Sequence, residues 1–224
     1  MKRAVIVVAA GSGSRMGGEL PKQYLQLQGK PVIIHTLEKF RNFDPEIKVV
    51  VVLAPAHREL WEDVATSYAI CKDLVLAEGG ASRYDSVKSG LTHIGEEGLI
   101  GIHDAVRPLV SQDTLLRTYE AAQHKGSGIP VIEIEETVRR LDDGGGSTHL
   151  NRSILRKIQT PQVFRAGQIK EAYQQAYDSA FTDDASVYES VYGNVNLVEG
   201  NRENIKITTS TDMQLASLLI ASPE

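Results

Sequence analysis

Hydrophobic residues along the chain alternate between short continuous runs and stretches in which they recur every three or four positions. The continuous runs are rich in valine and isoleucine, which is typical of strands buried on both faces of a parallel sheet. The expected strands are 3–10, 47–54, 73–78, 99–105 and 127–134. Helical spacing is found between them, at 31–43, 57–69, 82–94 and 111–123. This alternation predicts an α/β fold with a doubly wound, mostly parallel sheet, whose ligands lie beyond the carboxyl ends of the strands.

One stretch breaks this alternation. Residues 136–155 contain two polar-apolar strand candidates around an Asp-Gly-Gly-Gly turn, which is a hairpin signal. A lone two-stranded ribbon is marginally stable in water, so we expect this protruding arm, at about 136–156, to pack on a second subunit and form a homodimer. The later expected elements are helices at 166–179 and 184–192, strands at 194–199 and 204–208, and a terminal helix opened by Ser210. We expect one domain spanning 1–224.

The composition narrows the range of functions. With 42% hydrophobic residues among 224, the chain can bury a substantial core. Its formal net charge of -5 argues against a general nucleic-acid binder, which would carry a basic stripe. The first apolar run breaks into glycine after a few residues, which suits a buried strand and neither a signal peptide nor a membrane span. Because Cys71 stands alone in the sequence, we expect a buried thiol, no disulfide and a cytoplasmic protein with no membrane partner.

A glycine-rich segment, Ala-Ala-Gly-Ser-Gly-Ser-Arg-Met-Gly-Gly at 9–18, follows the first expected strand. Backbone N–H groups in such a turn can approach phosphate oxygens. The segment differs from a Walker loop because Glu19 follows the last glycine, and from a dinucleotide fingerprint because Met16 replaces a glycine. What remains is a loop with two cations, Arg15 and Lys22, that can brace a triphosphate. The alternative is a flexible turn with solvated charges.

The segment AAGSGSRMGGELPKQY resembles the signature loop of sugar-nucleotide pyrophosphorylases and small-molecule cytidylyltransferases. Further motifs follow in the order found in one family: GGASRYDSV (79–87), HDAVRPLV (103–110), TPQVFR (160–165) and NIKIT (204–208). That family is 2-C-methyl-D-erythritol 4-phosphate cytidylyltransferase, of the non-mevalonate isoprenoid pathway, and the resemblance runs from about residue 3 to the end. It implies a Rossmann-like nucleotidyltransferase that joins CTP and methylerythritol phosphate into 4-diphosphocytidyl-2-C-methyl-D-erythritol, releasing pyrophosphate.

The resemblance also assigns roles to particular residues. Those implied to wrap the CTP phosphates are Ala9, Ala10, Gly11, Ser12, Gly13 and Ser14. Arg15 and Lys22 are implied to be catalytic, by stabilising charge around the α-phosphorus. Those implied to hold the cytosine are Gly80, Ala81 and Ser86, while Asp104 and Arg107 face the ribose and the acceptor. The acceptor pocket is implied to be completed by Thr182 and Lys206, with Thr137 and Arg152 from the partner's arm.

Several of these side chains also have ordinary structural interpretations. Asp104 ends an expected buried strand at the ligand edge of the sheet, and a carboxylate there needs a hydroxyl, a metal or a cation. An ion pair with Arg107 would satisfy it. His103 should point to the opposite face and belong to the core. Arg152 could be a solvated arm residue, and Thr182 the N-cap of the next helix.

The implied reaction sets modest demands on the protein. A phosphomonoester has its second pKa near 6, so the acceptor phosphate is mostly dianionic at neutral pH and needs no general base. Catalysis then reduces to in-line positioning and charge neutralisation. Mg²⁺ is the expected cofactor, held mainly by phosphate oxygens and water, with Asp104 as the candidate protein ligand.

Alternative functions remain open at this stage. The nearest is a cytidylyltransferase for another polyol phosphate, such as ribitol 5-phosphate, on the same scaffold. A sugar-phosphate nucleotidylyltransferase that uses another triphosphate fits the later motifs less well. A non-catalytic nucleotide-binding module would explain the fold but leaves unexplained the cations distributed over several segments.

Overall fold

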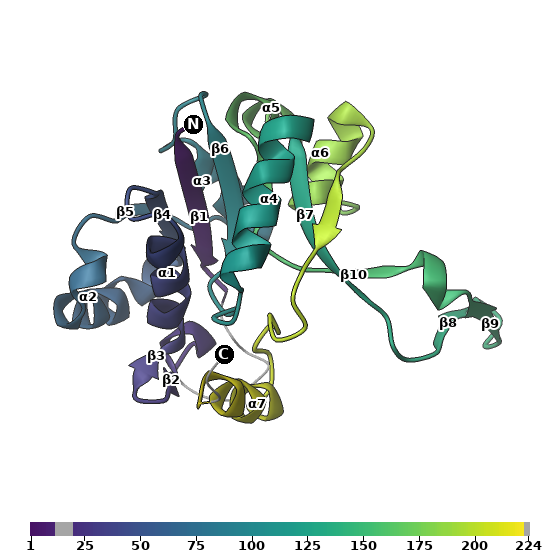
Figure 1. Ribbon diagram of the computed structural model, residues 1–224, viewed down its shortest axis with the longest axis horizontal. Helices are drawn as coiled ribbons and strands as arrows, with labels where there is room; N and C mark the ends of the chain where they lie inside the picture. Colours follow the sequence, from purple (N-terminus) through teal and green to yellow (C-terminus); the bar gives the residue numbers. More distant parts are fainter. Residues whose placement is uncertain (12–19, 222–224) are drawn as a thin grey trace.

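The computed structural model describes residues 1–11 and 20–221, and within these residues it has a central sheet of eight strands (Figure 1). Four neighbouring strands run parallel, in the spatial order β5 (Val75–Glu78), β4 (Lys48–Leu53), β1 (Arg3–Ala9) and β6 (Leu99–Asp104). Strand β11 (Gln162–Arg165) lies next to β6 and is antiparallel to it. Beyond β11 come β7 (Ser127–Glu133) and then β10 (Arg156–Ile158), each antiparallel to the strand before it. Strand β12 (Leu197–Glu199) pairs with β7 in parallel. The sheet is therefore mixed and mostly parallel, as the hydrophobic runs predict.

Successive residues of β1 enter two different cores. Val5 and Val7 pack on one face of the sheet, and Ala4 and Ile6 on the other, because side chains of a strand alternate between its faces. The first face is covered by α1 (Val32–Phe43), α2 (Arg58–Ser67) and α4 (Gln112–Lys125). The second is covered by α3 (Arg83–Leu91), α5 (Ala166–Ala172) and α6 (Asp184–Tyr192). The predicted doubly wound arrangement is confirmed.

Shorter elements surround the carboxyl ends of the strands. Between β1 and α1 lie η2 (Lys22–Tyr24), β2 (Gln26–Leu27) and β3 (Lys30–Pro31), and α2 is flanked by η3 (Pro55–His57) and η4 (Ala69–Cys71). The last helix, α7 (Ser210–Ala221), packs with Leu27, Val32 and Ile207 in a small third cluster. Among the described residues, no helix combines the length and the apolar character needed to span a membrane.

The structure differs from the sequence expectations after residue 160. Residues 204–208 form no strand. The Ile207 N–H donates to the Val106 carbonyl (2.9 Å), and its side chain is buried in the cluster with α7. Helix α5 ends at Ala172 rather than near 179, because the side chain of Gln175 donates to the Ala172 carbonyl (2.8 Å). The antiparallel strand β11 was not expected from the sequence at all.

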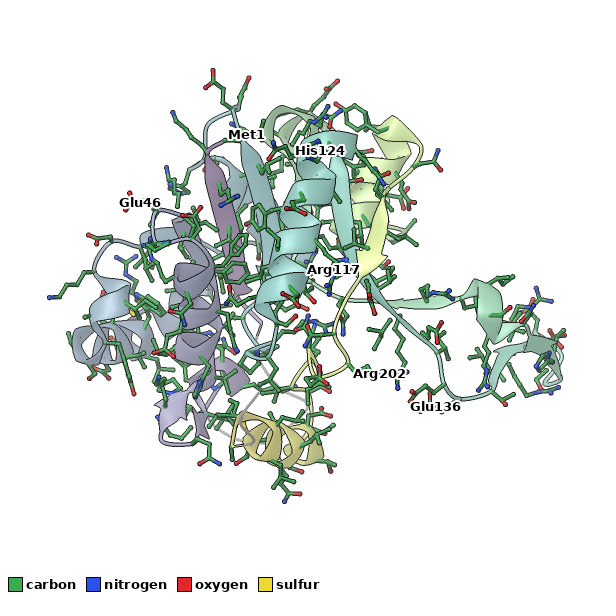
Figure 2. All side chains as sticks on the ribbon, in the orientation of Figure 1. Met1, Glu46, Arg117, His124, Glu136 and Arg202 are labelled. Carbon is green, nitrogen blue, oxygen red and sulfur yellow. The ribbon has the colours of Figure 1, made fainter. Side chains whose placement is uncertain are left out.

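The predicted hairpin is present and projects from the body (Figure 1). Its strands are β8 (Val138–Leu141) and β9 (Ser147–Leu150), paired in antiparallel register, and Gly145 in the turn has a φ of +82°. Leu141 is 82% exposed. Figure 2 shows Glu136 and Arg202 where the arm leaves the body. The hairpin thus carries apolar side chains that its own subunit leaves uncovered.

Candidate active site

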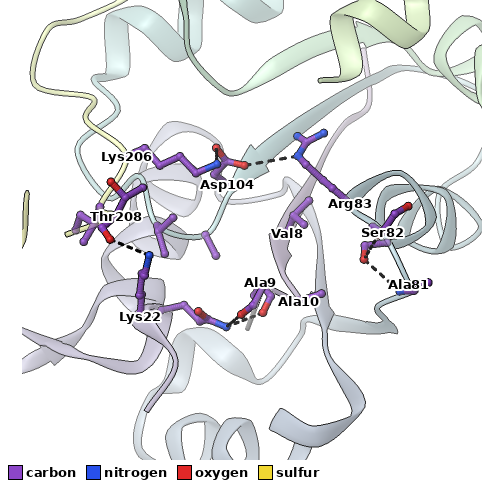
Figure 3. A pocket seen from close by; sticks show the side chains of 17 residues that line it. Val8, Ala9, Ala10, Lys22, Ala81, Ser82, Arg83, Asp104, Lys206 and Thr208 are labelled. Atoms are coloured by element: carbon purple, nitrogen blue, oxygen red, sulfur yellow. Dashed lines mark hydrogen bonds and ion pairs between the residues drawn. The ribbon is translucent and has the colours of Figure 1, made fainter. Parts of the chain in front are cut away.

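A pocket of about 490 Å³ opens at the carboxyl ends of β1 and β6 (Figure 3). In the described part of the chain, five segments line it: residues 8–11 at the end of β1, 22–23 in η2, 80–86 at the start of α3, 104–106 after β6, and 206–208. Because parallel strands end at the same edge, segments far apart in sequence meet here. This is the edge where the sequence predicts the ligand site.

The chain leaving β1 is held by a buried amide. The Gln23 side chain donates to the carbonyls of Ala9 (2.7 Å) and Gly11 (3.4 Å) and is only 3% exposed. Ala9, Ala10 and Gly11 line the pocket as the sequence predicts. The remaining predicted loop residues lie outside the described part of the chain: Ser12, Gly13, Ser14 and Arg15.

Lys22 reaches the pocket from η2. Its side chain is almost fully buried, and its ammonium donates to the main-chain carbonyl of Thr208 (2.9 Å). Thr208 is itself fixed by Asp212, which accepts from its main-chain N–H (2.8 Å) and its hydroxyl (2.7 Å). The positive charge of Lys22 is therefore held in one place, on the opposite side of the pocket from α3.

The amino end of α3 forms another wall. Ser82 caps the helix in a reciprocal capping box with Asp85, which fixes the first turn of α3 where Ser82 and Arg83 line the pocket. Ser86 is buried, and its hydroxyl accepts from the Gly80 N–H (3.1 Å) and donates to the Ser82 carbonyl (2.9 Å). A Cβ at Gly80 would collide with Asp85, so this close turn requires glycine. The hydroxyl of Ser86 thus shapes the main chain at Gly80 and Ala81, which all line the pocket.

Asp104 lies at the centre of a charged cluster. Its Oδ2 atom contacts the Lys206 ammonium (3.1 Å) and the Arg107 Nε (3.2 Å), and its Oδ1 faces the Arg83 Nε at 3.8 Å. Burial alone would raise the pKa of Asp104, but Arg83, Lys206 and Arg107 outweigh it and hold the pKa well below its usual range. The carboxylate is therefore ionised across the physiological range. The predicted ion pair with Arg107 is present.

His103 belongs to the core, as its place in the strand predicts. It is fully buried, and burial lowers its pKa to about 4, although its bond to the Arg107 carbonyl acts in the opposite direction. The ring Nε2 lies 3.0 Å from that carbonyl, which can only accept, so Nε2 carries the proton. Nδ1 then accepts from the Thr160 hydroxyl (3.0 Å), which in turn accepts from the Asp104 N–H (3.2 Å). The histidine stays neutral and supports the backbone beneath Asp104.

The other predicted acceptor residues are placed differently. Lys206 lines the pocket, whereas Arg107 lies behind it and donates to the Asn204 carbonyl (2.8 Å). Thr182 is exposed and outside the pocket lining, and the helix it precedes is capped by Asp183, so its interpretation as an N-cap is wrong. Within one subunit, the arm residues are not brought to this pocket.

Those arm residues are Thr137 and Arg152, both exposed. Arg152 lines a separate hollow at the base of the arm, together with Arg156 and Arg202. Arg202 forms an ion pair with Glu135 there. Because Glu133 also lines this hollow, its surface carries both signs of charge.

Sequence reasoning missed several residues of the described pocket lining, among them Gln23, Arg83 and Thr208. Gln23 directly follows Lys22, Thr208 ends the NIKIT motif, and Arg83 lies inside GGASRYDSV. The motifs themselves were the available signal. The partners of these side chains lie far away in sequence, which no local pattern reveals.

The donor set at the pocket limits how a metal ion could be held. The described residues contain no group of three or more His, Cys, Asp or Glu suited to a metal ion. Asp104 is the one carboxylate lining the described pocket, and its Oδ2 is already engaged by two cations. Mg²⁺ is often bound through one carboxylate together with substrate phosphates and water. The residues fit an ion that arrives with phosphates, rather than one that the protein holds alone.

A doubly wound sheet with a pocket at the carboxyl ends of its strands, beside a glycine-rich sequence segment, is the arrangement of an α/β nucleotide-binding protein. The family model of 2-C-methyl-D-erythritol 4-phosphate cytidylyltransferase matches residues 3–222. The chain belongs to this family.

Known relatives agree over the whole chain. The 2-C-methyl-D-erythritol 4-phosphate cytidylyltransferase of Phocaeicola vulgatus is 48% identical over 220 residues, covering 98% of this chain and 100% of the relative. The crystal structure of that enzyme from Francisella tularensis superposes with a TM-score of 0.80 at 33% identity, over 97% of this chain and 99% of the other. The crystal structure of the Thermus thermophilus enzyme gives a TM-score of 0.80 at 30% identity, over 99% of this chain and 100% of the other.

Proposed function

We propose that this protein transfers the cytidylyl group of CTP to 2-C-methyl-D-erythritol 4-phosphate. The products are pyrophosphate and 4-diphosphocytidyl-2-C-methyl-D-erythritol. The observation that carries the proposal is the meeting of Lys22, Lys206 and the amino end of α3 around one pocket beside the glycine-rich turn, in a chain that matches this family almost end to end.

The chemistry is an in-line displacement at phosphorus. An oxygen of the acceptor's phosphate attacks the α-phosphorus of CTP, the bond from that phosphorus to the bridging oxygen breaks, and pyrophosphate leaves with the electron pair. The attacking phosphate is a dianion at neutral pH and needs no base. In keeping with this, the described residues that line the pocket include no histidine.

Each wall of the pocket has a part in this proposal. The main chain at 9–11 and the following loop cradle the triphosphate. Lys22 and Arg15 neutralise charge that develops at the α-phosphorus. The cytosine lies against the turn formed by Gly80, Ala81 and Ser86, whose shape is set by the bond from the Gly80 N–H to the Ser86 hydroxyl.

The acceptor side is built around Asp104. In the proposal its carboxylate binds ribose or acceptor hydroxyls, and Lys206 binds an anionic group of the substrates. Arg107 holds Asp104 from behind. Mg²⁺, brought in by the triphosphate, would supply further charge neutralisation, and Asp104 is the side chain placed to contact it.

The arm completes the site from a second subunit. Its hairpin extends away from the body and leaves Leu141 and Ile154 uncovered. A symmetric homodimer in which each arm packs on the other subunit would bury them. Arg152 and Thr137 would then approach the neighbour's acceptor, and the planar fork of Arg152 suits a phosphate.

The test is steady-state turnover of CTP with different acceptors. We expect 2-C-methyl-D-erythritol 4-phosphate to give the highest kcat/KM, and ribitol 5-phosphate, the acceptor of the nearest alternative function, to be turned over far more slowly. Comparable or faster turnover of ribitol 5-phosphate would reject the proposed acceptor while keeping the reaction type.

A further inference from the structure

Arg83 lines the pocket between two carboxylates that belong to different elements. Its two terminal nitrogens donate to Asp184, Nη1 to Oδ1 at 2.9 Å and Nη2 to Oδ2 at 2.6 Å. Its Nε faces the Oδ1 atom of Asp104 at 3.8 Å (Figure 3). One guanidinium therefore joins the start of α6 to the central carboxylate of the site.

The contact with Asp184 fixes the guanidinium in one orientation. The Asp184 side chain is fully buried, and the Tyr173 hydroxyl donates to its Oδ1 at 2.7 Å. Two parallel bonds between an arginine fork and a carboxylate constrain both position and plane. A lysine could supply the charge but not this geometry. Arg83 is thus held by a rigid partner before any substrate binds.

Lys206, on the other side of Asp104, is held much less firmly. Its side chain is 41% exposed, against 12% for Arg107 and 31% for Arg83. Arg107 and Arg83 each have a second anchor, the Asn204 carbonyl and Asp184 respectively. For Lys206 the described part of the chain shows a single ion-pair partner, Asp104. An anionic substrate in the pocket would attract this ammonium in preference to the two fixed guanidinium groups.

We propose that Arg83, clamped by Asp184, is a positioning residue that holds the Oδ1 side of Asp104 in place while Lys206 turns toward the bound substrate. This inference rests on the proposed function, which brings a polyanion next to Lys206. When Lys206 leaves, Asp104 loses one of its two Oδ2 contacts and acquires a nearby phosphate of like charge. Arg83 and Arg107 then prevent the carboxylate from rotating away from the substrate.

The test compares wild type with Arg83→Gln, Asp184→Asn and the double variant. A matched control is Arg3→Gln, which breaks an ion pair with Asp44 (3.1 Å) near the start of β1, at the opposite end of that strand from the pocket. The kcat is measured at saturating substrates on protein shown by circular dichroism to be folded at the assay temperature. Separately, substrate-free crystal structures of Lys206→Ala and of Lys206→Ala combined with Arg83→Gln are compared for the orientation of the Asp104 carboxylate.

We expect each single variant to lose about 10- to 100-fold in kcat, as misplaced catalytic groups do. The double variant should be no slower than Arg83→Gln, because Asp184 acts through Arg83. The Asp104 carboxylate should keep its wild-type orientation in Lys206→Ala and lose it when Arg83→Gln is added, and Arg3→Gln should match wild type in kcat. A folded Arg83→Gln with kcat within about threefold of wild type, additive losses in the double variant, or an Asp104 orientation that Arg83→Gln leaves unchanged in the Lys206→Ala background would each overturn the proposal.

A variant that retains charge covers the case in which Arg83→Gln does not fold. Arg83→Lys keeps a cation near Asp104 but cannot form the paired bonds to Asp184, so we expect at least about a tenfold loss in kcat. Wild-type kcat in Arg83→Lys would overturn the proposal. If the wild-type protein itself shows no turnover, the proposed function is wrong, and the orientation of Asp104 in the substrate-free crystal structures still decides the role of Arg83.

Discussion

The ammonium of Lys22 donates to the main-chain carbonyl of Thr208 at 2.9 Å, across 186 positions of the sequence. This bond joins the segment after the glycine-rich turn to the segment before α7, so the two ends of the chain close the same pocket. A buried lysine bound in this way is fixed in position before substrate arrives, and preorganised charge of this kind stabilises a transition state most effectively.

Removing that charge should slow the chemical step. Lys22→Ala is expected to lower kcat by about 10²–10³-fold, the usual loss for one preorganised charge-stabilising donor. Arg15→Ala should behave alike. Circular dichroism controls for folding, and a variant that keeps more than about a third of wild-type kcat would contradict the role assigned to its residue.

The buried neutral His103 should make stability depend on pH. Its pKa is lowered to about 4 by burial, whereas an unfolded histidine titrates near 6.5. Between these values the unfolded state binds the extra proton, so this contribution is fully present above about pH 6.5 and is lost as pH falls toward 4. The free energy of unfolding should fall on the order of 3 kcal/mol through this one group.

Urea unfolding at pH 7 and pH 4.5 measures the effect, with His103→Gln as the comparison. Glutamine does not titrate, so the variant should lose less stability than wild type over this interval. Burial also lowers the pKa values of His35 and His57. Both residues are present in the two proteins, so their contributions cancel in the comparison. Equal pH dependence in the two proteins would show that His103 is not held neutral.

The proposed base pocket predicts the choice of nucleotide. The turn at Gly80 is held closely against Asp85 and Ser86, which suits a pyrimidine better than a purine. We expect ATP and GTP to have kcat/KM at least about a hundredfold below CTP, since mismatched polar groups would be left unpaired. Comparable turnover with ATP would reject this assignment of the turn.

Subunit sharing can be tested by mixing two inactive proteins, Lys22→Ala and Arg152→Ala. If each arm serves the neighbouring site, a heterodimer has one intact site and one doubly damaged site, so random exchange should restore about a quarter of wild-type activity. A matched control mixes Lys22→Ala with Lys206→Ala, whose lesions lie in the same subunit's pocket and should not complement. Mixtures that exchange subunits yet stay inactive would place Arg152 outside the neighbour's site.

The sequence predicts those parts of the fold in which local pattern and tertiary environment agree. The valine-rich runs at β1 and β4 are buried on both sides and were recognisable as strands. Strand β11 was missed because its apolar run is only two residues long and is flanked by the polar residues Gln162 and Arg165. It is a strand because it pairs with β6 and β7. Conversely, 204–208 alternates like a strand, but no neighbouring strand among the described residues pairs with it.

In the candidate site too, residues with local partners were predictable from the sequence and residues with distant partners were not. Asp104 was recognisable because it ends a buried strand, and its ion pair with Arg107 is local in sequence. Arg83 could not be recognised in this way, because Ser-Arg-Tyr-Asp looks like the exposed start of a helix. The partner of Arg83, Asp184, lies 101 positions away in the sequence. A side chain whose role depends on a distant partner requires the tertiary structure to be identified.

The most direct test of the proposed reaction follows all phosphorus atoms at once. Purified protein, CTP, Mg²⁺ and 2-C-methyl-D-erythritol 4-phosphate are combined, and the reaction is monitored by ³¹P NMR. The account predicts that the CTP resonances disappear while pyrophosphate and a new diphosphate diester appear in equal amounts, with Lys22→Ala as the slow control. Unchanged CTP, or release of pyrophosphate without formation of the diester, would contradict cytidylyl transfer to this acceptor.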